Sequence, residues 1–327
     1  MRLSALEQIP LFAGHDPRTT LEETVRLARG LEEAGYHRFW LAEHHNTSAF
    51  LSSAPDLLMT HLLGATQRIR IGSGGVMAMH YGSLQMAERF ATLATLFPGR
   101  VDMGLGRAPG GDMLAAAALN QGRTIDPDSI DVLITETAGL LRDDLPAHHP
   151  YAGLEVTPHP EVLPEMWLLG SSGQSAAWAG AQDLNYAYAQ FFTGRQDPGV
   201  MARYREHLPG DHVSGQTLSA LSVSAAATRE EAVEQALPAA GFRLAMRTGR
   251  PVVFQDPSQM DEEHRAELRR YLERDTSMIV GTYDEVAQVV RRFASNHGTE
   301  EVMLISYIAD VEAKVAQYRE LAARLVG

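Results

Sequence analysis

The sequence of 327 residues contains no cysteine, which excludes disulfide scaffolds, zinc sites with thiolate ligands and cysteine nucleophiles. Lysine is almost as scarce, because Lys314 is the only one and all other Lys or Arg positions are arginine. We expect Lys314 to lie on a surface helix. The sequence therefore gives no indication of catalysis through a lysine Schiff base.

Long apolar runs and an excess of positive charge are also missing. No run of about 18 apolar residues could span a bilayer, and residues 1–7 lack the apolar core of a signal peptide. Acidic residues outnumber basic ones by 41 to 28, which gives a net charge of −13 and argues against nucleic acid or an anionic membrane as a partner. We therefore expect a cytoplasmic protein.

What the sequence does contain is an alternation of short apolar segments and amphipathic helices. Thr20 with Glu23 forms a capping box that predicts the start of the first helix, and Thr282 with Glu285 does the same for a late one. We count eight strand candidates, among them residues 39–42, 69–73, 101–105, 166–169, 186–189, 218–224 and 302–306. Eight such units in one domain of residues 1–327 predict an α/β fold, a closed (β/α)8 TIM barrel, rather than an open doubly wound sheet.

Residues 247–275 interrupt this alternation with a highly charged stretch. We interpret it as an insertion over the barrel mouth. It is either a solvated helical excursion or a lid that closes over the mouth, and the residues favour neither.

Candidate catalytic residues follow the second strand. The active site of a TIM barrel is built from the loops at the carboxyl ends of the strands, and Glu43, His44 and His45 stand in such a loop. A histidine beside a carboxylate could act as a base or bind a metal. Consecutive side chains on an extended chain point to opposite faces, so we do not expect both imidazoles to bind one ion. We predict catalytic roles for these three residues and no metal site.

Small residues follow the third strand, where Gly74 and Gly75 come after Ser73. Glycines at a strand end either let a flat ligand approach the main chain or form a tight turn. Taken alone, these residues favour the turn.

Two further loops carry residues that suit a phosphate group. Arg107 follows a Gly-Leu-Gly segment that begins like a dinucleotide fingerprint, but Pro109 stands where the third glycine is required. A fixed guanidinium at a strand end suits a phosphate. Hydroxyl residues and a glycine at the start of a later helix either cap it or offer backbone N–H groups to an anion. These residues are Ser171, Ser172, Gly173 and Ser175. Together with Arg107, they favour a phosphate cradle.

A second histidine pair, His148 and His149, lies among Pro146, Pro150 and Pro158. We interpret this stretch as a long surface loop in which nothing holds the two rings.

The motifs resemble those of the bacterial-luciferase-like family of flavin-dependent monooxygenases, in the branch of alkanal monooxygenase homologues. The matching blocks are residues 36–46, 70–76, 98–108, 167–172 and 280–282. The resemblance covers nearly the whole chain. One block would be a weak signal, but the first four, in order at barrel strand ends, are specific, and residues 280–282 add to them.

The resemblance implies that reduced FMN binds at the barrel mouth and that a non-prolyl cis peptide at residues 73–75 supports its ring. Arg107, Ser172 and Ser175 match residues that hold the phosphate, and Gln190 completes the expected cofactor-binding set. The resemblance also implies O2 and a small organic substrate. A homodimer is implied as well. Because no nicotinamide fingerprint is present, we expect a separate reductase to supply the reduced FMN.

His44 matches the histidine that manages protons in the family, and we expect its pKa near the ordinary value of about 6.5. Gly106 stands where the luciferase catalytic subunit carries a reactive cysteine. We therefore expect oxygenation without light emission. The insertion coincides with a loop that is mobile in the family, which supports the interpretation as a lid.

Three other functions stay open at this point. A deazaflavin-dependent enzyme that transfers hydride would share the same fold. A metal-dependent hydrolase would use the histidines as ligands. A non-catalytic protein would bind the flavin without oxidising a substrate.

Overall fold

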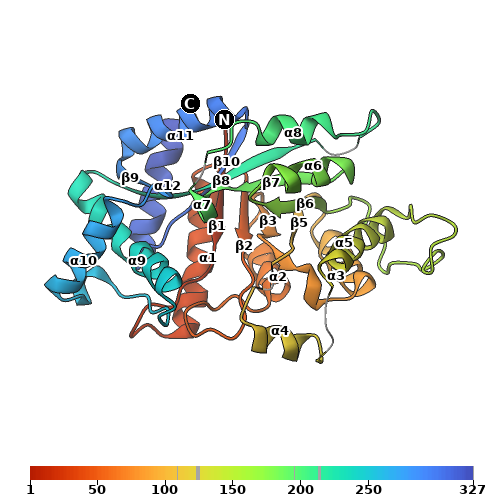
Figure 1. The fold of residues 1–327 in the computed structure, drawn as a ribbon, viewed down its shortest axis with the longest axis horizontal. Coiled ribbons are helices and arrows are strands. Elements are labelled where there is room, and N and C mark those ends of the chain that lie inside the picture. Colours follow the sequence, from red (N-terminus) through yellow and green to blue (C-terminus); the bar gives the residue numbers. More distant parts are fainter. Residues whose placement is uncertain (109, 123–125, 195, 213–214, 327) are drawn as a thin grey trace.

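Parallel strands form a closed ring at the centre of the molecule, and helices pack around it (Figure 1). The computed structural model describes residues 1–108, 110–122, 126–194, 196–212 and 215–326. Within these ranges, eight strands close the ring, because β10 pairs with both β1 and β8. They are β1 (Arg2–Glu7), β2 (Arg38–Leu41), β3 (Arg70–Ser73), β5 (Val101–Gly106), β6 (Glu165–Gly170), β7 (Asn185–Ala189), β8 (Thr217–Ala226) and β10 (Glu301–Ile305). The predicted TIM barrel is confirmed.

Two further strands lie outside this ring. β4 (Val76–Met77) pairs with the end of β5, and β9 (Met278–Thr282) pairs with residues 222–226 of β8. Residues 218–222 of the same long strand pair with β10. The sequence pattern does not indicate β9 as a strand, because its five residues come directly after the charged insertion.

The helix starts agree with the sequence in one case and differ in another. The capping box at Thr282 and Glu285 is present at the start of the eleventh helix, as predicted. The first helix starts earlier than predicted, because the side chain of Asp16 caps it and Pro17 occupies its first turn. The start predicted at Thr20 is wrong. The helices are α1 (Pro17–Glu33), α2 (Pro55–Ala65), α3 (Ser83–Leu96), α4 (Met113–Leu119), α5 (Pro127–Arg142), α6 (Gly173–Ala181), α7 (Gln190–Thr193), α8 (Val200–Glu206), α9 (Arg229–Thr248), α10 (Glu262–Leu272), α11 (Tyr283–His297) and α12 (Val311–Leu325), together with the short 3-10 helices η1 (Ala78–His80) and η2 (Pro257–Gln259).

Charged side chains fill the barrel interior at the amino ends of the strands. Arg38 is fully buried, and its guanidinium donates to Glu301 at 2.6 Å, Asp102 at 2.9 Å and Glu165 at 3.0 Å. Arg70 pairs with Asp102 at 2.6 Å and with Glu165 at 3.2 Å. This ion-pair cluster occupies the bottom of the barrel, so a ligand in the barrel must approach from the carboxyl ends of the strands.

Two tryptophans fill the next layer of the interior. The rings of Trp40 and Trp167 meet edge to face, with centroids 5.5 Å apart. Gly72 makes room for them, because a Cβ there would lie 2.6 Å from the Trp40 ring. By the alternation of the strands, several inward positions nearer the carboxyl ends carry small residues, whereas Leu169 and Ile305 are larger; the small ones are Ala42, Gly74, Gly106, Ala189 and Ala220. The inward side chains at this level are therefore small beside β2, β3, β5 and β7 and larger beside β6 and β10.

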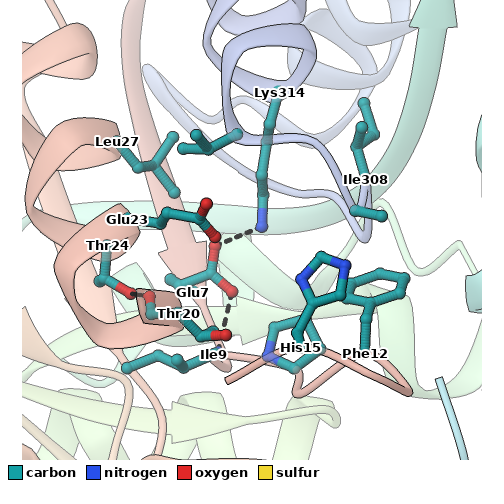
Figure 2. A pocket seen from close by; sticks show the side chains of 13 residues that line it. Glu7, Ile9, Phe12, His15, Thr20, Glu23, Thr24, Leu27, Ile308 and Lys314 are labelled. Atoms are coloured by element: carbon teal, nitrogen blue, oxygen red, sulfur yellow. Dashed lines mark hydrogen bonds and ion pairs between the residues drawn. The ribbon is translucent and has the colours of Figure 1, made fainter. Parts of the chain in front are cut away.

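Lys314 does lie on an outer helix, α12, but its side chain turns inward, so the expected surface position of the lysine itself is wrong. Its side chain is 6% exposed, and Nζ donates to a carboxylate oxygen of Glu7. Figure 2 shows Lys314 pointing from α12 toward Glu7 at the end of β1, with His15 beside the same small cavity of about 40 Å³. The other oxygen of Glu7 accepts from the backbone N–H of Ile9 at 2.8 Å. An amphipathic helix can thus turn a charged residue inward where a buried partner of opposite charge meets it.

We expect Lys314→Met to lower the free energy of unfolding by about 3–5 kcal/mol, because the carboxylate of Glu7 is then buried without its cation. Urea unfolding at pH 7 measures the loss. Arg319→Met on the same helix is the matched control, since Arg319 is 59% exposed and should cost less than about 0.5 kcal/mol. A loss below about 1 kcal/mol for Lys314→Met would contradict the prediction.

The predicted insertion begins later than expected, because α9 continues to Thr248. Its charged part forms α10, which packs on α9 through Leu268 beside Leu237. This part is the predicted helical excursion. The residues before it reach the barrel mouth, where Phe254 forms a bridge with Phe12 in the loop after β1. The insertion therefore has one part outside the barrel and one part at the carboxyl ends of the strands.

Candidate functional site

The loop after β2 holds a buried carboxylate that joins three segments. Glu43 is fully buried and accepts from Nε2 of His45 at 2.7 Å, from Oη of Tyr81 at 2.9 Å and from the backbone N–H of Met77 at 3.0 Å. It therefore ties its own loop to β4 and to the segment before α3. Of the expected catalytic residues, Glu43 and His45 are both engaged in this network.

His44 is held differently from its neighbours. Its ring stacks on Phe50 with centroids 4.3 Å apart and planes 19° apart. Among the described residues, its Nδ1 has no hydrogen-bond partner although the atom is buried. Burial, with a smaller contribution from His45, lowers the pKa of His44 to about 4. The ring is therefore neutral at pH 7, and the expectation of an ordinary pKa is wrong.

The segment after β3 has the predicted backbone. The peptide bond between Gly74 and Gly75 is cis. A Cβ on Gly75 would lie 2.8 Å from the carbonyl oxygen of Gly104, so close packing of the main chain on β5 requires glycine. The hydroxyl of Ser73 donates to that same carbonyl oxygen at 2.8 Å and is therefore engaged with β5.

The serines at the start of α6 form a cap. Oγ of Ser172 accepts from the backbone N–H of Ser175 at 3.3 Å, and Oγ of Ser175 donates to the carbonyl oxygen of Ser172 at 2.8 Å. Ser175 also meets the hydroxyl of Tyr186 at 2.9 Å. Ser171 is exposed, whereas Gln190 is buried at the start of α7. N-capping, one of the two interpretations of these serines, is present. The start of the helix is also exposed, which is compatible with the other interpretation, an anion that binds its backbone N–H groups.

Arg107 lies beside the same helix. Its guanidinium is 5.9 Å from the ring centroid of Trp178 on α6 and pairs with Asp131 on α5 at 3.3 Å. Burial raises the pKa of Tyr186 to about 12, and the positive charge of Arg107 is close enough to oppose that rise. The structure thus brings Arg107 and the serines to one side of the barrel mouth. Pro109, which interrupts the dinucleotide fingerprint, lies outside the described residues.

Sequence reasoning missed a second arginine near the start of α6. The guanidinium of Arg203 on α8 lies against Gly173, where an added Cβ would come within 2.5 Å of Nη1. Asp197 holds Arg203 at 2.9 Å. No local pattern could have identified Arg203, because one arginine on a short helix carries no signal in the sequence. The same applies to Tyr81, which contacts Glu43 from the segment before α3, and to Phe50, which lies further along the loop that holds His44.

The ring of His149 is fixed, so the interpretation of a loop that holds neither ring is wrong. Its Nε2 lies 3.2 Å from the carboxylate of Glu136, and its Nδ1 accepts from the backbone N–H of Tyr151 at 3.2 Å. Glu136 lies on α5 and His149 in the loop after it, and both line a surface cavity with other residues of that helix.

Two kinds of feature are absent from the described residues. No three or more His, Asp or Glu side chains there are grouped so that they could hold a metal ion. No helix in the same ranges is long and apolar enough to cross a membrane.

Comparison with known proteins places these features in context. A family model described as luciferase-like monooxygenase matches residues 1–324. The N-acetyl-S-alkylcysteine monooxygenase of Bacillus subtilis (strain 168) is 35% identical over 326 residues, which cover 98% of this chain and 97% of the relative. The crystal structure of apo-MsnO8 is 30% identical and has a TM-score of 0.88, with 99% of this chain and 98% of that one covered.

Two more distant structures share the fold but differ in cofactor. One is the oxygenating constituent of 3,6-diketocamphane monooxygenase from Pseudomonas putida in complex with FMN, at 14% identity and a TM-score of 0.71, over 99% of this chain and 98% of that one. The other is an F420-dependent secondary alcohol dehydrogenase, at 19% identity and a TM-score of 0.71 with the same coverage. The fold therefore accepts either cofactor.

Proposed function

Since the chain belongs to the luciferase-like monooxygenase family, we propose that it is an FMN-dependent monooxygenase that uses reduced FMN and O2 to oxidise a small organic substrate. Oxygen insertion calls for a flavin that reacts with O2, and the Bacillus subtilis relative is named as a monooxygenase. One observation carries the proposal. Arg107 and the start of α6 lie at the same end of the barrel as His44.

The residues at the mouth fit this cofactor. Arg107 and the N-terminus of α6 offer positive charge for its phosphate. Gly74 and Gly75, joined by a cis peptide bond, would present main chain without side chains to a flat ring. His44 keeps a buried Nδ1 without a partner among the described residues, which is an atom that a bound group or a proton can satisfy.

Bound reduced FMN would supply the electrons that activate O2. The protein's own part is to bind, orient and exclude water. We assign proton acceptance at Nδ1 to His44, which is neutral at pH 7. We assign a positioning role to Glu43 and His45, because the carboxylate is buried and engaged with Met77 and Tyr81.

The partners follow from the same proposal. A separate reductase supplies the reduced FMN, and a homodimer in the cytoplasm stays a prediction. The name of the Bacillus subtilis relative makes N-acetyl-S-alkylcysteines the first substrates to test. The deazaflavin alternative remains as the second candidate, because an F420-dependent enzyme shares the fold.

Binding of three cofactors tests the proposal. We expect reduced FMN to bind more tightly than reduced F420 in an anaerobic titration. We also expect Arg107→Ala to weaken FMN by about 10- to 100-fold, since a charge-assisted hydrogen bond contributes about 1.5–3 kcal/mol. Riboflavin, which lacks the phosphate, should be affected less than about twofold. Arg319→Ala is the matched control, because Arg319 is 59% exposed and pairs with Glu33 at the end of α1, on the side of the barrel away from the mouth.

Three outcomes would argue against the proposal. Tight F420 binding without FMN binding would favour hydride transfer. Equal losses for FMN and riboflavin would remove Arg107 from the phosphate site. FMN binding without any product from N-acetyl-S-alkylcysteines, aldehydes or small aromatic substrates, with a reductase present, would favour a non-catalytic flavin-binding protein.

A further inference from the structure

A chain of aromatic rings connects His44 to the insertion. His44 stacks on Phe50, and Phe50 meets Phe254 with ring centroids 5.3 Å apart and planes 68° apart. Phe254 belongs to the segment between α9 and α10, more than two hundred positions after His44 in the sequence. The insertion thus contributes a ring to the support of the expected catalytic histidine.

Phe254 is fixed by packing on several sides. Its ring is fully buried, and its centroid lies 5.5 Å from that of Tyr307, 5.6 Å from that of Phe12 and 5.7 Å from that of Phe242. These three rings come from the loop after β10, the loop after β1 and α9. Aromatic contacts at these distances are favourable beyond the area that they bury.

The main chain holds the same arrangement. The carbonyl oxygen of Phe254 accepts from the backbone N–H of Ala13 at 2.8 Å. On its other side, the loop after β1 is joined to the loop that carries Phe50, because Leu11 donates to Ala49 at 2.9 Å and Leu51 donates to Ile9 at 3.0 Å. Three segments far apart in sequence therefore lie side by side at the mouth.

His44 depends on this packing more than His45 does. A carboxylate hydrogen bond orients the ring of His45. Nδ1 of His44 has no partner among the described residues, so packing against Phe50 must set the direction in which this nitrogen points. A ring that is free to turn would expose Nδ1 to water and would lose the buried position in which it can meet a bound group.

We propose that Phe254 is a positioning residue that acts through Phe50 to hold the ring of His44 in its orientation at the mouth. The inference rests on the role of His44 in the proposed function. The insertion then supports the site and does not merely cover it, because Phe254 packs on Phe50 and Phe50 packs on His44.

The test compares Phe254→Leu with Phe293→Leu. Phe293 is a matched control, since its buried ring also stacks on a histidine, His297, at 3.8 Å, but on α11. NMR titration of the histidine ring protons is the first readout, and it does not depend on activity. Product formed per reduced FMN consumed is the second readout, and the Kd of FMN is the third.

In wild-type protein, we expect His44 to titrate near pH 4, well below the ordinary value of about 6.5. Phe254→Leu should move that titration upward and reduce product per reduced FMN by about 10-fold or more. The Kd of FMN should change less than about threefold. Phe293→Leu should shift the titration of His297 and leave His44 and the product yield unchanged, even if both variants lose similar stability.

An unchanged titration of His44 in folded Phe254→Leu would overturn the inference, because the ring would then be a packing residue only. If that variant does not fold, Phe254→Met replaces it. A wild-type titration near 6.5 would also overturn the inference, since His44 would then not be held in a buried stack. Failure of the proposed function has a different signature, in which the wild-type titration is low but no substrate is oxidised.

Discussion

Arg38→Met is expected to leave the chain at or beyond the limit of stable folding. The methionine fills part of the volume, but Asp102 and Glu301 stay fully buried and lose the guanidinium of Arg38. Among the described residues, only Arg70 then still pairs with Asp102, and only the half-exposed Arg2 with Glu301. Removing one partner of a buried pair costs about 3–5 kcal/mol, and here two carboxylates are affected at once. Because whole domains are stable by only about 5–15 kcal/mol, we expect little folded protein at 37 °C.

The pKa of Arg38 shows that the carboxylates of the cluster outweigh the effect of burial on its guanidinium. Burial alone would lower it, but Asp102, Glu301 and Glu165 together raise it above its ordinary value. The cation is therefore present at every pH at which the protein folds. Urea and thermal unfolding measure the loss. Arg18→Met is the control, because Arg18 is 87% exposed and its loss should cost less than about 0.5 kcal/mol. A cost for Arg38→Met below about 1 kcal/mol would contradict the argument.

The second large effect concerns chemistry and not folding. His44→Ala should reduce product formation by about 10²- to 10⁴-fold, the range typical of a lost proton acceptor. FMN should still bind, because the proposed phosphate site, at Arg107 and α6, follows β5 and β6 and does not include the loop after β2. Product yield, peroxide release and the Kd of FMN are the measurements, and His61→Ala on the exposed face of α2 is the control. An unchanged yield of product would remove His44 from the mechanism.

The pH dependence follows from the lowered pKa of His44. A histidine whose pKa falls from 6.5 to about 4 stays neutral from pH 7 down to about 4 and becomes charged below that value. Activity that needs the neutral ring is therefore kept between pH 7 and 5 and lost toward pH 4. A decline in rate centred near pH 6.5 would have to come from another group. The free energy of unfolding changes in the same direction. The unfolded chain binds a proton at His44 near pH 6.5, whereas the folded chain does so only near pH 4, so the stability decreases as the pH falls between these two values.

The sequence predicted the barrel because strand and helix patterns are local. The seven strand segments named from the pattern all lie in the ring, and β1 closes it. The start of α1 was misplaced because two signals competed, and the Asp16-Pro17 pair was stronger than the box at Thr20. Lys314 was misplaced because the pattern of α12 does not show that Glu7 meets it from β1.

The site could be predicted only in part, for the same reason. Residues at strand ends, such as His44 and Arg107, follow from the order of strands along the chain. Their partners come from distant segments and have no local signature: Tyr81 contacts Glu43, Arg203 lies against Gly173, and Phe254 reaches the mouth from the insertion. The pKa of His44 was missed because it depends on burial that these partners create.

The burial of Lys314 has a practical consequence for measuring these effects. A protease that cuts after lysine has one target in this sequence, the bond between residues 314 and 315. That bond lies in the first turns of α12, beneath a buried side chain. Cleavage requires α12 to leave the barrel, so the appearance of two fragments reports how often the molecule opens. The chain carries its own single-site reporter of unfolding, without any added label.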